Sequence, residues 1–164
     1  MRSLLALPLI ALLTASCATT STGTSGKTDK RAIESVIFVK SSPPVSATLR
    51  RDQTLTINKD LSARLEIKDG YNKLLNKKAG TITAQQFKTL TEKLNEADYT
   101  RLRAKKRDAP LVGSPTHTLV VKSDQGAHRF IESAMTTFPT ELEAIFAAQT
   151  QYVPTAPVPV AKTK

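Results

Sequence analysis

Six residues in the first half of the chain alternate between apolar and charged side chains, and this alternation constrains the fold more than any other feature. Residues 63–68 read ARLEIK. Because successive side chains of a β-strand point to opposite faces, the pattern predicts a strand that is buried on one face. The dipeptide Asp69-Gly70 follows directly. It is typical of a type I′ turn, so it predicts a hairpin into a second strand at 71–75.

Further strand signals precede this hairpin. An apolar run at 35–39 is of strand length and is followed by the breaker Pro43-Pro44. Two shorter strand-like pieces, at 47–49 and 54–57, surround a polar turn at 50–53. These segments add strands to the expected sheet.

Two helices are predicted by local signals. Thr83 and Gln86 have the spacing of a capping box, and Phe87, Leu90, Leu94 and Ala97 then follow on one helical face, so we expect a helix that ends near Glu96. Pro139 suits the first position of a second, shorter helix, whose apolar stripe comprises Leu142, Ile145 and Phe146. The expected fold class is α+β: a small antiparallel β-sheet with one main helix and a short C-terminal helix packed on one face.

The N-terminus has the features of an exported protein. Met1-Arg2-Ser3 is a short positive region, and the apolar run 4–13 is too short to span a bilayer. Thr14-Ala15-Ser16-Cys17 then resembles the lipobox of bacterial lipoproteins, with Thr14 where Leu is usual. This resemblance implies cleavage before Cys17 and a lipid anchor on its thiol. The alternative is an ordinary secretory signal that is cut nearby and releases a soluble protein.

Four segments follow from these features. Residues 1–16 are the expected signal peptide, and 17–32 comprise the lipidated cysteine with a flexible Thr-, Ser- and Gly-rich tether. Residues 33–151 form the expected single domain, and 152–164 a Pro-rich, disordered tail. Cys17 is the only cysteine, so no internal disulfide is possible. By resemblance to Gram-negative lipoproteins, Ala18 after the cysteine implies the outer membrane, facing the periplasm.

The chain is basic, with a formal net charge of +10. For an exported protein this charge indicates no nucleic acid; the anionic partners outside the cytoplasm are lipid headgroups, surface polysaccharide or acidic envelope proteins. One segment concentrates the charge, and Lys73, Lys77 and Lys78 add to it from the predicted loop before the main helix. The alternative interpretation is an exposed connector that only solvates the domain. The candidate residues for contact with an anionic surface are Arg101, Arg103, Lys105, Lys106 and Arg107.

A second hairpin contains both histidines. Residues 116–122 and 127–132 flank the turn 123–126, and pairing of Lys122 with Ala127 places His128 opposite Val121 and His117 opposite Glu132. The histidines would lie ~13 Å apart, too far for one metal ion to bridge. The His117–Glu132 pair is either an acid/base pair or a polar cross-strand pair on a solvated face.

Other catalytic patterns are missing from the sequence. Val112-Gly113-Ser114-Pro115 lacks the second glycine of a nucleophile elbow. Zinc-ligand spacing and Gly-rich phosphate loops are also absent. We therefore expect a protein that is not an enzyme and has no cofactor or metal.

The order of elements over about 62–150 resembles small exported domains of unknown function in bacterial lipoproteins. It is similar, more loosely, to small proteinaceous inhibitors of bacterial metalloproteases. Cys17 is the only residue to which a resemblance, that of the lipobox, assigns a role. We expect a membrane-anchored envelope lipoprotein that acts as a non-catalytic binding or accessory module; the alternative is an inhibitor of an envelope or secreted hydrolase.

Overall fold

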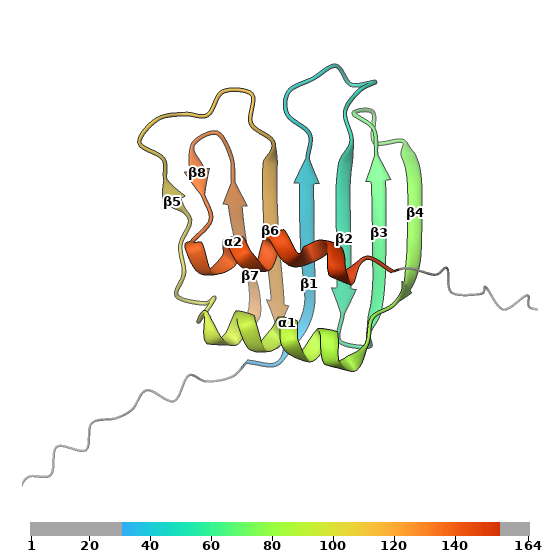
Figure 1. The fold of residues 1–164 in the computed structure, drawn as a ribbon, viewed down its shortest axis with the longest axis vertical. Helices are drawn as coiled ribbons and strands as arrows, with labels where there is room; N and C mark the ends of the chain where they lie inside the picture. The colour runs from blue at the N-terminus through green and yellow to red at the C-terminus, as the bar shows by residue number, and fades with distance from the viewer. Residues whose placement is uncertain (1–30, 155–164) are drawn as a thin grey trace, which may run out of the picture.

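The computed structural model describes residues 31–154 and shows a sheet covered by helices on one side (Figure 1). The elements in chain order are β1 (Ile33–Ser41), β2 (Asp52–Asn58), β3 (Ser62–Lys68), β4 (Leu74–Thr81), α1 (Ala84–Glu96), β5 (Lys105–Lys106), β6 (Thr116–Ser123), β7 (Gly126–Glu132), β8 (Thr136–Thr137), α2 (Thr140–Ala147) and the 3₁₀ helix η1 (Ala148–Tyr152). The α+β prediction is confirmed.

The main sheet has six antiparallel strands in the order β4-β3-β2-β1-β6-β7, and β5 and β8 form a separate two-stranded ribbon. The N-terminal strand β1 therefore lies in the centre. Val36 of β1 lies between Ile57 of β2 and Val121 of β6. All three side chains are fully buried, which fixes the register because a slip by one residue would expose them.

The core lies between one face of this sheet and the two helices, which cross it in front in Figure 1. Leu90 and Leu94 of α1 are fully buried, and the rings of Phe146 of α2 and Phe38 of β1 meet edge to face at 5.7 Å. The capping box is present, because Thr83 Oγ1 accepts the Gln86 N–H and Gln86 Oε1 accepts the Thr83 N–H. Helix α1 ends at Glu96 as predicted.

The first hairpin differs from the prediction. β4 begins at Leu74, not at residue 71, and five residues rather than two connect it to β3. Asp69 Oδ1 accepts the N–H groups of Tyr71 and Lys73, and Asn72 takes the left-handed conformation at φ 62°. The side chain of Asp69 thus organises a wider loop, and the predicted type I′ turn is wrong. Lys77 and Lys78 lie in the edge strand β4, not in a loop.

Three other expectations are wrong. Residues 47–49 form a turn instead of a strand, because the Ser46 carbonyl accepts the N–H groups of Leu49 and Arg50. Tyr152, assigned to the C-terminal tail, is only 2% exposed and belongs to the core. α2 begins at Thr140, so Pro139 precedes the helix as its cap residue instead of starting it.

The N-terminal predictions fall outside the described residues. Residues 1–30, with the signal peptide, Cys17 and nearly all of the tether, and residues 155–164 of the tail are not described. Within 31–154, neither helix has the length and apolar character needed to cross a bilayer.

Candidate functional site

A charged cluster joins the ends of β6 and β7 to the connector after α1. His117 of β6 lies opposite Glu132 of β7 as predicted, with Nδ1 2.9 Å from Oε2. Arg107 donates from Nη2 to the other carboxylate oxygen, Oε1, at 2.9 Å, and its Nε donates to the Ser133 and Thr136 carbonyls. Each of the side chains of Arg107, His117 and Glu132 is about a quarter exposed. Glu132 is thereby held on both oxygens.

The His117–Glu132 pair lies on the helix-covered side of the sheet, because His117 shares a face with the buried residues Leu119 and Val121. The expectation of a solvated face is therefore wrong. The imidazole packs against the Phe146 ring at 4.9 Å, and Lys40 Nζ lies 5.8 Å from the same ring. A cavity of about 250 Å³ adjoins the cluster, and it is lined by Lys40, His117, Glu132, Phe138, Glu143, Phe146 and Ala147.

The cavity can accept a small polar group beside His117, but no Ser, Thr or Cys lines it as a nucleophile. Among residues 31–154, no three His, Cys, Asp or Glu side chains are placed to hold a metal ion. The second histidine, His128, packs edge-on against buried Tyr99 at 5.3 Å. The cluster thus joins β6, β7 and the connector through hydrogen bonds.

The structure divides the basic segment into three environments. Arg101 pairs with Asp98 at 3.2 Å, and Arg103 donates to the Thr100 and Leu102 carbonyls. Arg107 turns inward to Glu132, so the expectation that it contributes to an exposed cationic connector is wrong. Lys105 and Lys106 form the exposed strand β5.

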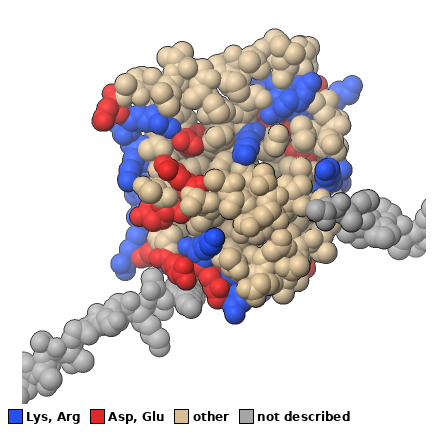
Figure 2. All heavy atoms as spheres, in the orientation of Figure 1, with Lys and Arg blue, Asp and Glu red and all other residues tan. Residues whose placement is uncertain are grey.

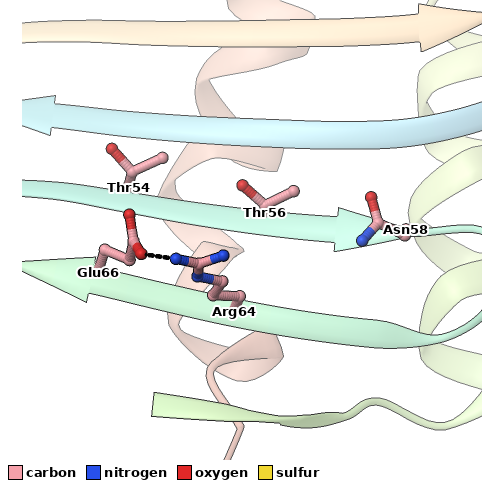
Figure 3. Close-up of a pocket in the computed structure, with 5 residues that line it drawn as sticks. All are labelled: Thr54, Thr56, Asn58, Arg64 and Glu66. Atoms are coloured by element: carbon pink, nitrogen blue, oxygen red, sulfur yellow. Dashed lines mark hydrogen bonds and ion pairs between the residues drawn. The ribbon is translucent and has the colours of Figure 1, made fainter. Parts of the chain in front are cut away.

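A second candidate surface, which is not among the predicted sites, is the open face of the sheet, which we define as the side turned away from α1 and α2. No described element covers it (Figure 1). Figure 3 shows part of this face with the helices behind the sheet: a hollow of about 230 Å³ lined by Thr54, Thr56 and Asn58 of β2 and by Arg64 and Glu66 of β3. Arg64 and Glu66 form an ion pair there.

The centre of the open face is made of small and β-branched residues. By register it carries Ile37 and Val39 of β1 and Val120 of β6, all half-buried. Cations surround this centre: Arg64, Lys68, Lys77, Lys122 and Arg129. Two acids on this side, Asp52 and Glu66, already pair with arginines.

The helix face carries more acid. Each helix contributes two glutamates, Glu92 and Glu96 from α1 and Glu141 and Glu143 from α2. Figure 2 shows red atoms gathered over part of this side. Helix α1 also carries Lys88 and Lys93, so cations on the same helix partly balance these glutamates. The residues of the open face are those that alternate with the core residues along each strand, and this alternation is the feature of the sequence that could have identified them.

No protein-family model matches the chain, and no curated protein is similar in sequence.

Proposed function

We propose that this chain is a lipid-anchored protein of the cell envelope whose domain is a non-catalytic binding module, and that the open face is its binding surface. The observation that carries the proposal is that one side of a six-stranded sheet is left uncovered by every described element. The lipobox at 14–17 supports the anchor. Ala18 after the lipidated cysteine favours the outer membrane.

The open face is large enough for a protein partner. Six strands spaced about 4.8 Å apart, each about seven residues long at about 3.3 Å per residue, present roughly 650 Å² in projection. A standard protein interface buries about 800 Å² on each side. The flat centre of Thr, Val and Ile side chains can exclude water, while the surrounding polar groups provide hydrogen bonds.

The charges indicate the kind of partner. Lys122 and Arg129 of β6 and β7 are exposed and point to the open side, and no acid of the described residues pairs with either one. An acidic protein of the envelope would complement them and associate faster at low salt. Lys105 and Lys106 at the neighbouring edge of the domain would extend the same attraction.

The test is capture of partners from an envelope extract with the mature protein as bait. The variant Lys122→Glu/Arg129→Glu reverses two open-face charges and should lose a partner that the wild type retains. The matched control is Lys88→Glu, a reversal on the exposed side of α1, and it should retain the partner. Equal capture by all three proteins would contradict the proposal. Capture of a hydrolase that loses its activity in the complex would favour the inhibitor instead.

A further inference from the structure

Four loops come together at one end of the main sheet, which we call the loop end. They are 42–51, 69–73, 107–115 and 133–135, and they connect strand ends that the register places side by side: Asp52 opposite Lys68, Ser41 opposite Thr116, and His117 opposite Glu132. In Figure 1 these loops lie at the top, away from the point where β1 begins.

The loop end holds all the large hydrophobic side chains that are exposed in the described part of the chain. Six lie in the four loops, and the other three lie within two residues of a loop, at the start of β4 or the end of β7. They are Val45, Leu49, Tyr71, Leu74, Leu75, Leu111, Val112, Ile131 and Met135. Single exposed hydrophobics are ordinary on a protein surface, but a concentration of all of them at one end indicates an interaction site.

Backbone hydrogen bonds hold these loops in place. Gly70 N–H donates to the Ala47 carbonyl, Leu111 N–H to the Ala134 carbonyl, and Arg107 N–H to the Met135 carbonyl. Each loop is thus joined to a neighbour, and the apolar side chains are presented outward. Leu49 is 68% exposed, Tyr71 70% and Val112 96%.

Cations stand directly beside the apolar tips. Arg50 and Arg51 follow Leu49, and Lys73 follows Tyr71 two residues later. Aliphatic side chains, a tyrosine and long cationic side chains at one end suit the boundary between lipid headgroups and acyl chains. Arg50 pairs with Asp52 and Arg51 donates to the Thr48 and Arg50 carbonyls, so Lys73 is the cation best placed to reach a phosphate. Figure 2 shows the upper end mainly as uncharged atoms, with Lys and Arg atoms just beneath.

We propose that the loop end docks on a lipid bilayer, with Leu49, Tyr71 and Val112 inserted among the headgroups. The row of separate tips extends across the sheet from β3 and β4 to β7, so it fits a plane better than it fits a compact pocket-filling contact. The proposal does not depend on the open face, which stands at right angles to this end.

The chain before β1 is long enough to allow this orientation. β1 starts at the opposite end from the loops and its nine residues extend about 30 Å. Residues 18–32 can span at most ~50 Å at about 3.3 Å per residue. An anchor at Cys17 therefore lets the loop end reach the same membrane, and it raises the local concentration of lipid so that weak docking suffices.

The test uses the fact that the chain has no tryptophan. The mature chain, starting at Cys17, is coupled through this single thiol to a maleimide-bearing lipid in phosphatidylglycerol-containing vesicles, so anchoring does not depend on natural lipidation. All buried hydrophobic residues described lie between Ile33 and Tyr152, so this chain retains the core. Val112→Trp and Gln125→Trp each introduce one fluorophore, at the loop end and at the opposite end.

Tryptophan emission and its quenching by brominated acyl chains report depth in the bilayer. We expect Val112→Trp to shift to shorter wavelength and to be quenched several-fold more than Gln125→Trp. Gln125 lies beside the start of β1, since the Asp124 N–H donates to the Ala32 carbonyl. If proximity to the anchor alone determined depth, Gln125→Trp would be quenched more than Val112→Trp. Equal quenching, stronger quenching at Gln125, or none at either position would overturn the proposal.

A second variant tests whether the tips act together. Adding Leu49→Asp and Tyr71→Asp to Val112→Trp should lower the fraction of tethered protein whose loop end is docked, measured by quenching, about tenfold or more, because two exposed apolar groups are lost from the contact. The matched control adds Lys59→Asp at the opposite end of the sheet, where the residue is also exposed, and it should leave quenching unchanged. Quenching that survives the paired change would mean that the tryptophan alone drives insertion, and would also overturn the proposal.

Discussion

The N–H of Gly70 donates a hydrogen bond of 2.9 Å to the carbonyl oxygen of Ala47, and this bond joins the β3–β4 loop to the β1–β2 loop. The approach is so close that a Cβ on residue 70 would lie 2.6 Å from Ala47 Cα and 2.8 Å from its carbonyl oxygen. Both atoms belong to the backbone and cannot rotate away. Glycine is therefore required at this position by contact with a distant loop.

Gly70→Ala should destabilise the domain by about 1–3 kcal/mol, because one of the two loops must shift and the hydrogen bond must lengthen. Urea denaturation followed by circular dichroism measures the change. Gln125→Ala, in an exposed turn at the other end, serves as the control and should stay within about 0.5 kcal/mol of wild type. A Gly70→Ala protein as stable as the control would contradict the packing described.

Glu132→Gln should cost about 1–3 kcal/mol of stability, because one of the two carboxylate oxygens that face Arg107 and His117 is replaced by an NH2 group, which cannot accept a hydrogen bond in this half-buried site. Thermal and urea unfolding measure the loss. The matched change Glu141→Gln, on the exposed side of α2, should be nearly neutral. If the two variants lose the same amount, the cluster makes no special contribution to the fold.

Tyr99→Phe should leave stability unchanged or raise it by up to about 1 kcal/mol. The Tyr99 hydroxyl is buried and finds no hydrogen-bond partner among residues 31–154, whereas the ring packs edge-on against His128. Phenylalanine keeps the ring and removes the unpaired group. A loss of more than about 1 kcal/mol would reveal a hydrogen-bond partner for this hydroxyl.

The stability of the domain should fall at alkaline pH through Tyr152. Burial raises the pKa of its phenol above the usual 10.0, and an opposing hydrogen bond from Gln151 lowers it less. The folded state therefore keeps the proton longer than the unfolded state does. Its contribution is fully present below pH 10 and is lost as pH rises through the folded-state pKa.

Urea denaturation at pH values from neutral to strongly alkaline measures this dependence. Tyr152→Phe should reduce the alkaline slope, and Tyr71→Phe, which changes an exposed tyrosine, should leave it as in the wild type. Identical slopes in all three proteins would show that Tyr152 does not titrate differently in the folded state.

Labelled palmitate should enter the wild-type protein and not Cys17→Ser, because Cys17 is the only thiol that can accept a lipid. Membrane fractionation of both proteins gives a second measurement. If both remain soluble and unlabelled, the lipobox interpretation is wrong. The loop-end experiment would remain valid, because there the protein is attached to lipid chemically.

Local signals predicted the second hairpin and the main helix correctly. The pairing of His117 with Glu132 followed from counting outward from Lys122 and Ala127, and Thr83 with Gln86 marked the start of α1. These features depend on residues that are close in sequence. The structure confirms them without register error.

Long-range contacts explain what the sequence did not predict. From the sequence, Gly70 was predicted to be a turn residue, but in the structure glycine is needed there because the backbone lies so close to Ala47. Arg107 was predicted to be one of several exposed cations in the basic segment, but it forms an ion pair with Glu132, which is distant in the sequence. The sequence also could not show which face of β6 the helices cover, because Val120 on one face and Val121 on the other are equally apolar.

The central position of the N-terminal strand has a consequence for how the fold assembles. β1 pairs with β2 at once, but its other neighbour, β6, lies beyond α1 in the second half of the domain. A chain that emerges with its N-terminus first, from a ribosome or from a membrane pore, therefore exposes one unpaired edge of its most apolar strand until β6 has followed. Closing this gap is a slow, non-local step. The sheet is completed only after most of the domain has emerged, and until then this edge is open to a chaperone or to a second, incomplete chain.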